Sequence, residues 1–254
     1  MTDPGRSLPE PSPNWALFLD IDGTLLDLAA TPTEVVIPAG LPDLLRALSR
    51  RLGGAVAVVS GRALTDIDTL LSPLTLAAAG QHGAEIRLPD GGIERFDAAA
   101  KLLDSLLPAV EAFAAARTGI LVEDKGMTIA AHCRQVPQYQ TELGEFLDGL
   151  AARYPDCLET IRGHRVFEIK PRNLSKRTAV EHFMRVAPFA GRLPVFIGDD
   201  RTDEDGFAAV KAAGGYAIRV GLDGPSIANW RIADPAGTRA FLSRAAEALN
   251  EDAR

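Results

Sequence analysis

A short apolar run that ends in two aspartates constrains the fold of this chain more than any other feature. Ala16–Leu19 has no polar interruption, which is the pattern of a strand buried on both faces of a parallel sheet. Asp20 and Asp22 follow it, and side chains two positions apart in extended chain lie on the same face. Carboxylates this close repel each other and lose solvation together, a cost that an oxygen-binding cation such as Mg²⁺ would relieve.

Two further apolar runs end in polar residues in the same way. Pro194–Gly198 leads into Asp199 and Asp200, and Ala55–Val59 leads into Ser60-Gly61-Arg62. Ligands of open α/β sheets bind at the carboxyl ends of the strands, and a hydroxyl with nearby backbone N–H groups suits a phosphate oxygen. Each motif alone is also typical of an ordinary turn, loop or helix cap. Their shared position at strand ends favours one functional site.

The remaining pattern predicts an α/β fold, with a Rossmann-like parallel-sheet core and an inserted α+β cap domain. Strands and helices alternate over residues 15–97 and again over 173–254. Between these segments, residues 98–172 follow the order helix, two strands, helix, two strands, which indicates a domain with its own antiparallel sheet. Residues 1–14 contain four prolines, and we expect them to form a disordered tail.

Composition excludes several classes of function. The net charge of −7 and the absence of a basic stripe argue against nucleic-acid binding. No apolar run is long enough to cross a membrane, and the first residues lack the apolar segment of a signal peptide. Cys133 and Cys157 show neither metal-ligand spacing nor a disulfide framework. We therefore expect a cytoplasmic protein with a small-molecule partner and no nucleic-acid or membrane partner, and we favour a monomer over an oligomer.

In chain order, the motifs resemble those of the phosphatases of the haloacid dehalogenase superfamily. These motifs are Asp20–Thr24, Ser60–Arg62, Lys176 and Gly198–Glu204. More narrowly, the chain resembles the trehalose-6-phosphate phosphatase family in four further motifs, which are Gln81–Glu85, Glu123–Gly126, His132–Arg134 and Phe167–Arg172. The chain departs from the family pattern where Asn173 and Arg177 replace glycines on either side of Lys176.

The resemblance implies a phosphoric monoester hydrolase that converts trehalose 6-phosphate to trehalose and phosphate through an aspartyl-phosphate on Asp20. Asp22 would donate a proton to the leaving sugar oxygen and then accept one from water, so it must be protonated at the first step. Ser60 would hydrogen-bond the phosphoryl oxygens. Lys176 would neutralise the phosphate and restrain the nucleophile, although Lys170 is a competing candidate for the phosphate contact.

The resemblance also implies a metal site and a sugar site. The cofactor would be Mg²⁺, held by Asp20, the backbone carbonyl of Asp22, and Asp199, with Asp200 in support. The implied substrate-binding residues are Arg62, His82, Gly83, Glu123, Lys125, Arg134, Glu168 and Lys170. Charged and polar side chains of this kind suit the hydroxyl groups of a disaccharide. The same residues are also compatible with an exposed sheet face that carries ordinary ion pairs.

Three alternative functions stay open at this point. The first is a phosphatase of the same superfamily that acts on another sugar phosphate, such as sucrose phosphate or glucosylglycerate phosphate. A catalytically silent domain that binds a sugar phosphate is a second reading, and a phosphotransferase that uses a sugar as acceptor is a third. The intact set of carboxylates favours a catalyst, and the motifs of the inserted domain favour trehalose 6-phosphate.

Overall fold

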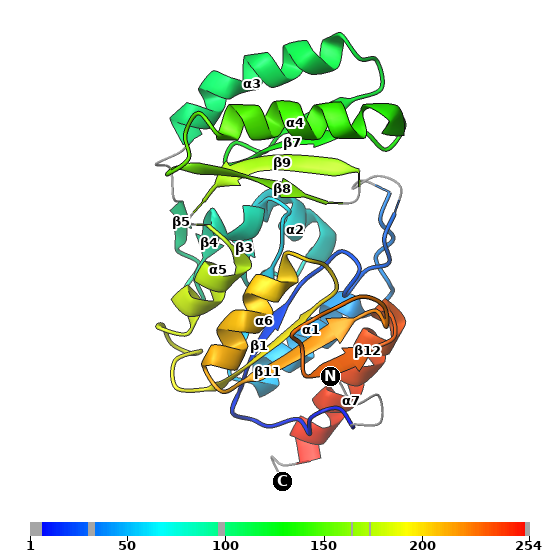
Figure 1. The fold of residues 1–254 in the computed structure, drawn as a ribbon. Coiled ribbons are helices and arrows are strands. Elements are labelled where there is room, and N and C mark those ends of the chain that lie inside the picture. The colour runs from blue at the N-terminus through cyan, green and yellow to red at the C-terminus, as the bar shows by residue number, and fades with distance from the viewer. Residues whose placement is uncertain (1–6, 30–33, 96–99, 164, 173, 252–254) are drawn as a thin grey trace. The chain divides into compact units, whose positions relative to one another are not determined.

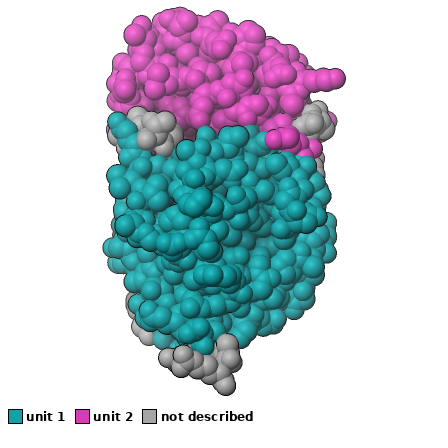
Figure 2. Space-filling model, turned by 180° about the vertical axis from the view of Figure 1, so that it is seen from behind, with its two compact units in different colours: residues 1–94, 175–254 teal, residues 95–174 magenta. Residues whose placement is uncertain are grey.

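The structure, a computed structural model, describes residues 7–29, 34–95, 100–163, 165–172 and 174–251 (Figure 1). The chain forms two compact units, which Figure 2 distinguishes by colour. Unit 1 comprises residues 1–94 and 175–254, and unit 2 comprises residues 95–174. The predicted boundaries follow residues 97 and 172, and residues 96–99 and 173 lie outside the described residues.

Unit 1 is built on an eight-stranded sheet with the strand order β12-β11-β10-β1-β2-β3-β4-β5. The strands are β1 (Trp15–Leu19), β2 (Val56–Val59), β3 (Ala77–Gly80), β4 (Glu85–Arg87), β5 (Ile93–Arg95), β10 (Leu193–Gly198), β11 (Tyr216–Val220) and β12 (Trp230–Ile232). Parallel pairing joins the strands from β12 to β3, and β4 pairs antiparallel with β3. The parallel part confirms the predicted α/β core. The sequence analysis missed β4 and β5, because strands of three residues leave no apolar run to recognise.

Helices cover both faces of this sheet. They are α1 (Leu41–Arg51), α2 (Leu64–Leu71), α5 (Lys176–Phe183), α6 (Asp203–Ala212) and α7 (Pro235–Glu251), and a short 3₁₀ turn, η1, spans Gln81–Gly83. From β1 the chain moves outward through β2 and β3, whereas from β10 it moves in the other direction through β11 and β12. Right-handed crossovers therefore place α1 and α6 on opposite faces (Figure 1). None of the helices in the described ranges is both long and apolar enough to span a membrane.

The reversal of strand order between β1 and β10 creates a topological switch point, the position where open α/β sheets bind ligands. An aromatic cluster fixes the elements around it. The ring of Phe18 on β1 lies 6.0 Å from that of Phe183 on α5 and 5.5 Å from that of Phe189. All three side chains are fully buried. This packing attaches α5, which begins at Lys176, to the central strand.

Unit 2 has the predicted order of elements. They are α3 (Ala100–Ala115), β6 (Leu121–Asp124), β7 (Ile129–His132), the 3₁₀ turn η3 (Pro137–Tyr139), α4 (Gln140–Ala151), β8 (Leu158–Arg162) and β9 (Val166–Pro171). The strands pair antiparallel in the order β6-β7-β9-β8. Alternate side chains, among them Ile129 and Phe167, join the core formed with the two helices. Glu123, Ala130 and Glu168 lie in cross-strand register on the other face.

Residues 7–14 differ from the predicted disordered tail. The indole nitrogen of Trp230 donates a hydrogen bond to the Ser7 carbonyl at 2.8 Å. The guanidinium of Arg192 donates another to the Pro13 carbonyl, also at 2.8 Å. These contacts hold the segment before β1 against unit 1 without a helix or strand of its own. Residues 1–6 lie outside the described residues.

Replacing Phe189 with Ala is expected to lower the free energy of unfolding by about 3–5 kcal/mol, because a fully buried ring is lost and a cavity remains. Urea denaturation followed by circular dichroism measures this change. The control is Leu222→Ala, since that side chain is 66% exposed and its loss is expected to cost less than about 0.5 kcal/mol. Equal losses in the two variants would contradict the packing described here.

Candidate active site

Lys176 forms the centre of a buried charged group at the switch point. Its Nζ donates hydrogen bonds to Asp20 Oδ1 at 2.8 Å and to Asp203 Oδ1 at 2.6 Å. All three residues are buried, with 5% of Asp20 and none of Asp203 exposed. Burial alone would lower the pKa of Lys176, but the two carboxylates outweigh it and raise that pKa well above its ordinary value. The ammonium is therefore a permanent positive charge in the site.

A capping box determines where α5 begins and hence where Lys176 lies. The Ser175 hydroxyl accepts a hydrogen bond from the backbone N–H of Thr178, and the Thr178 hydroxyl accepts one from the backbone N–H of Ser175. Lys176 is therefore the first residue of the helix, directly beside the end of β1. Asn173 lies outside the described residues. Arg177, the second departure from the family pattern, lies on the helix surface, 3.7 Å from Glu181.

Asp203 is the residue of this group that the sequence analysis did not assign to the site. Besides its contact with Lys176, its Oδ2 accepts hydrogen bonds from the backbone N–H groups of Asp199 at 2.9 Å and Asp200 at 3.0 Å. Asp203 is the first residue of α6, and a carboxylate in the first turn readily reaches backbone N–H groups of the preceding loop. The sequence alone did not single out Asp203, because a run of acidic residues does not show which of them faces inward.

Asp199 follows β10 and packs against the turn after β1. Its Oδ1 accepts a hydrogen bond from the Thr24 hydroxyl at 3.2 Å. A methyl carbon built on Gly23 would lie only 2.2 Å from Asp199 Oδ2. Gly23 also has a φ of +80°, a conformation that glycine adopts without strain. Both requirements explain why glycine follows the Asp-x-Asp pair.

The carboxylates form a cluster that fits a metal ion. Oxygens of Asp20, Asp199 and Asp203 all lie within 4.8 Å of one another. Burial raises the pKa of Asp20 to about 7, although Lys176 acts in the opposite direction. Burial and the charge of Asp203 raise the pKa of Asp199 to about 7 as well. One ammonium does not balance three carboxylates, so a divalent cation with a preference for oxygen ligands suits the site.

The hydrogen bonds show which oxygens remain for such an ion. Both oxygens of Asp203 are occupied, one by Lys176 and the other by two backbone N–H groups. Asp20 Oδ2 and Asp199 Oδ2 accept no hydrogen bond from the described part of the chain. Asp20 and Asp199 are therefore the better ligands, and Asp203 orients the groups around them.

Asp200, which the sequence analysis placed with the metal, closes the turn before α6. Its Oδ1 accepts hydrogen bonds from the backbone N–H and the hydroxyl of Thr202, both at 2.7 Å, and from the backbone N–H of Asp203 at 3.2 Å. Partial burial raises the pKa of Asp200, but the charge of Lys176 and the bonds from Thr202 outweigh it and lower that pKa. The side chain thus stabilises the loop that carries Asp199.

Asp22 and Arg62 form a bidentate ion pair. Arg62 Nε donates to Asp22 Oδ2 and Arg62 Nη2 donates to Asp22 Oδ1, each at 2.6 Å. The backbone N–H of Arg62 donates to the Ser60 hydroxyl at 3.2 Å. Ser60 directly follows β2 and is buried. The predicted acid–base residue is therefore paired with a residue that was expected to bind substrate.

His82 and Gly83 lie at the same edge of the sheet, in η1 after β3. The backbone N–H of His82 donates to the Ser60 carbonyl at 3.1 Å. A methyl carbon on Gly83 would lie 3.0 Å from the carbonyl oxygen of Ser175, the residue that caps α5. The site residues that the sequence predicted in unit 1 are thus brought together at the carboxyl ends of the parallel strands.

Unit 2 has a polar group of its own on the sheet face opposite its helices. Glu168 accepts hydrogen bonds from the Thr128 hydroxyl at 2.6 Å and from Lys125 Nζ at 3.4 Å. Glu123 lies 3.1 Å from the Nε2 atom of His132. The hydrogen bond from His132 lowers the pKa of Glu123, against the opposite effect of burial. Three predicted substrate-binding residues, Glu123, Lys125 and Glu168, therefore gather on one surface.

The other two predicted residues of unit 2 have different surroundings. Lys170 Nζ pairs with Glu159 at 2.6 Å and donates a hydrogen bond to the Leu174 carbonyl. Its ammonium thus connects the β8–β9 hairpin with the chain that leaves unit 2. Arg134 is exposed two residues beyond the end of β7. Of the two competing lysines, Lys176 is the one that contacts the acidic cluster.

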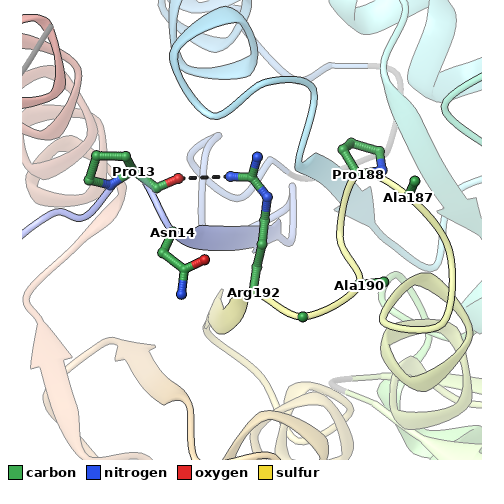
Figure 3. A pocket seen from close by; sticks show the side chains of 7 residues that line it. Pro13, Asn14, Ala187, Pro188, Ala190 and Arg192 are labelled. Carbon is green, nitrogen blue, oxygen red and sulfur yellow. Dashed lines mark hydrogen bonds between the residues drawn. The ribbon is translucent and has the colours of Figure 1, made fainter.

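A pocket of about 650 Å³ lies at the other end of the strands in unit 1. Its lining includes residues just before β1 and β10, and its residues are Pro13, Asn14, Ala187, Pro188, Ala190, Gly191 and Arg192. Figure 3 shows Arg192 turned toward the Pro13 carbonyl across this hollow. Because the pocket lies at the amino ends of the strands, it is separate from the acidic cluster at their carboxyl ends.

Sequence comparisons identify the family of this chain. The family model described as trehalose-phosphatase matches residues 18–236. The chain belongs to the trehalose-phosphatase family. It is 45% identical over 213 residues to a probable trehalose-phosphate phosphatase of Sinorhizobium fredii, covering 84% of this chain and 80% of the relative. It is 38% identical over 254 residues to the trehalose-6-phosphate phosphatase of Escherichia coli, covering 99% and 94%.

Structural comparisons support the same fold. A crystal structure of a trehalose-6-phosphate phosphatase related protein superposes with a TM-score of 0.79 at 24% identity, covering 94% of this chain and 99% of that one. The C-terminal domain of the Candida albicans trehalose-6-phosphate phosphatase also gives 0.79, at 19% identity, covering 91% of each chain. The predicted family and enzyme class, a trehalose-phosphatase and hence a phosphoric monoester hydrolase, are confirmed. The buried carboxylates fit the metal ion that such phosphatases generally use.

Without added metal, the free energy of unfolding is expected to fall as the pH rises from about 4 to about 7. Asp20 and Asp199 have pKa values of about 7 in the folded protein against an ordinary value of 3.8, so in this range the folded state holds protons that the unfolded state releases. Each carboxyl group can contribute at most about 1.4 kcal/mol per pH unit. Urea denaturation in a chelator at several pH values measures the slope.

Asp199→Asn should flatten this dependence, because it removes one of the carboxyl groups whose pKa is raised in the folded protein. Asp205→Asn, at an exposed position of α6, is the matched control and should leave the slope unchanged. A free energy of unfolding that rises over the same pH range, or equal slopes in the two variants, would contradict the raised pKa values of Asp20 and Asp199.

Proposed function

We propose that this protein hydrolyses trehalose 6-phosphate to trehalose and inorganic phosphate. The proposal rests chiefly on the buried contact of Asp20 with Lys176, next to Asp199, at the switch point of an α/β sheet. This contact holds a carboxylate in place beside a permanent positive charge, as attack on a phosphate monoester requires. The choice of trehalose 6-phosphate is supported by relatives of 38–45% identity that are named for that activity.

Asp20 is the nucleophile of the proposed reaction. Lys176 holds its carboxylate in place, and one carboxylate oxygen attacks phosphorus. A bond forms between this oxygen and phosphorus while the bond from phosphorus to the sugar oxygen breaks. Water then attacks the aspartyl-phosphate, which releases phosphate and regenerates the carboxylate. The covalent intermediate divides one difficult hydrolysis into two easier steps.

The proposed cofactor is Mg²⁺, and the proposed ligands are Asp20, the backbone carbonyl of Asp22, and Asp199. When bound, the ion would reduce the repulsion between the nucleophile and the phosphoryl group and stabilise charge on the transferring oxygens. Asp203 keeps Lys176 and the loop of Asp199 in place, and Asp200 closes that loop.

Asp22 is the proposed acid and base. Both of its oxygens are paired with Arg62 in this structure, so proton donation to the sugar oxygen requires that the carboxyl group turns away from the guanidinium. The planar guanidinium then offers two N–H groups to a phosphoryl oxygen pair, a geometry that it matches well. The hydroxyl of Ser60 donates a further hydrogen bond to the phosphoryl group.

The sugar is proposed to bind on the polar face of unit 2. Glu123, Lys125 and Glu168 present carboxylate and ammonium groups, which hydrogen-bond sugar hydroxyls. Thr128 and His132 hold the two carboxylates in position. The arrangement favours a substrate with several hydroxyl groups beyond the phosphate-bearing carbon.

A panel of sugar phosphates tests the function. Trehalose 6-phosphate should release phosphate with a kcat/KM at least about tenfold above those of sucrose phosphate and glucosylglycerate phosphate, because the missing hydroxyl contacts leave polar groups unpaired. Removal of divalent ions should stop the reaction, and added Mg²⁺ should restore it. Preferred turnover of another sugar phosphate would favour the alternative phosphatase, and tight binding without turnover would favour a silent binding domain.

Within the same assay, Asp20→Asn should reduce kcat by at least about 1,000-fold, because an amide does not attack phosphorus. The control is Asp27→Asn, at a carboxylate whose side chain is 73% exposed. This control should retain activity and separate the effect on chemistry from a general effect of losing a charge near β1. Phosphate transfer to an added sugar instead of water would indicate the phosphotransferase.

The two lysines should behave differently when each is replaced by methionine. Lys176→Met should reduce kcat by at least about 100-fold even with a small aryl phosphate ester, because the charge beside the nucleophile is lost. Lys170→Met should keep kcat for that small ester within about threefold and act mainly on stability, since it removes the ammonium that pairs with Glu159 and bonds to the Leu174 carbonyl. Equal losses of kcat would contradict the separation of roles.

A further inference from the structure

The loop of Ser60 and Arg62 is held by the turn that follows β3. The backbone N–H of His82 donates to the Ser60 carbonyl at 3.1 Å, and that of Gln81 donates to the Arg62 carbonyl at 2.9 Å. Gln81 and His82 have φ values of +48° and +57°. Consecutive left-handed residues other than glycine are uncommon, and they persist where the surrounding structure holds them in place. The left-handed turn is what directs these two N–H groups at the loop.

The ring of His82 packs directly on the middle residue of the same loop. A methyl carbon built on Gly61 would lie 2.8 Å from Nε2 and 2.9 Å from Cε1 of His82. The backbone of Gly61 is not left-handed, so the ring is the obstacle to a side chain at this position. His82 is 8% exposed. His82 therefore restricts the position of the loop through its ring as well as through its backbone N–H.

A shift of this loop would move two groups of the proposed reaction together. The Ser60 hydroxyl accepts a hydrogen bond from the Arg62 N–H at 3.2 Å, so the two residues move as one unit. The guanidinium of Arg62 in turn holds both carboxylate oxygens of Asp22. Catalytic groups must keep their geometry within a fraction of an ångström, and the groups behind them supply that precision.

We propose that His82 is a positioning residue, whose ring presses on Gly61 and thereby places Ser60 and Arg62 for phosphoryl transfer. This role differs from the direct substrate contact that the sequence resemblance implied for His82. It rests on the proposed function, because it assumes that Ser60 and Arg62 act on the phosphoryl group.

Two substitutions and their combination test the proposal. His82→Asn removes the ring but keeps a residue that tolerates the left-handed conformation well. Gly61→Ala adds a carbon where the ring now lies. In the double variant the smaller asparagine leaves room for that carbon. His182→Asn, which removes a partly buried ring on α5 beside Glu94, is the matched control.

With trehalose 6-phosphate and Mg²⁺, each single substitution should reduce kcat about tenfold, and the double variant should resemble His82→Asn alone. KM should change less than about threefold, because the sugar contacts lie elsewhere. The midpoint of thermal unfolding of His82→Asn should stay within about 2 °C of the parent, and His182→Asn should leave kcat unchanged.

Three results would overturn the proposal. Losses of kcat that multiply in the double variant would show that His82 and Gly61 act independently. A raised KM with unchanged kcat in His82→Asn would indicate a direct substrate contact. A loss of kcat that merely follows a loss of thermal stability would indicate a structural role alone.

Binding of inorganic phosphate in the presence of Mg²⁺, measured by calorimetry, separates this proposal from the proposed function. Inorganic phosphate is not turned over and has no sugar, so its binding tests only the groups that hold the phosphoryl group, among them the loop of Ser60 and Arg62. Its dissociation constant should rise about threefold in His82→Asn and remain unchanged in His182→Asn.

If the parent protein binds phosphate but does not hydrolyse trehalose 6-phosphate, the proposed function fails while the role of His82 is still decided by this measurement. An unchanged dissociation constant in His82→Asn would count against that role.

Discussion

The ammonium of Lys176, shared by Asp20 and Asp203, is the interaction on which the rest of the site depends. It joins the end of β1 to the first residues of α5 and α6, three elements that are far apart in the sequence. A lysine at the first position of a helix is disfavoured by the helix dipole. The two carboxylates compensate for this, and removal of Lys176 leaves both of these buried carboxylates without their counter-charge. Folding of unit 1 and assembly of the site are therefore coupled.

The same group carries more negative charge than one lysine can balance. Burial makes this surplus costly, which is why the pKa values of Asp20 and Asp199 rise to about 7. Either protons or a cation can relieve the cost. Protonation would remove the nucleophile, whereas an oxygen-binding cation would keep Asp20 ionised and available. The energetic strain of the cluster and its suitability for phosphoryl transfer thus have one physical origin.

The sequence predicted the positions of the site better than the orientation of its side chains. An apolar run followed by polar residues locates the end of a buried strand, so the edge that holds Asp20, Ser60 and Asp199 was predictable. Whether Asp200 or Asp203 faces inward depends on how α6 begins, and a run of acidic residues does not reveal that. The pairing of Lys170 with Glu159 depends on the register of β8 and β9, which a single sequence leaves open.

The departure at Arg177 shows how local structure can replace a family pattern. A glycine there would be required only if a side chain met an obstacle or the backbone were left-handed. Arg177 lies instead on the exposed surface of α5, one residue after Lys176 in ordinary helical geometry. Ser175 and Thr178 already fix the start of the helix through their reciprocal hydrogen bonds. The position of the lysine in this chain is thus set by the capping box, and the residue after it is free to be long and charged.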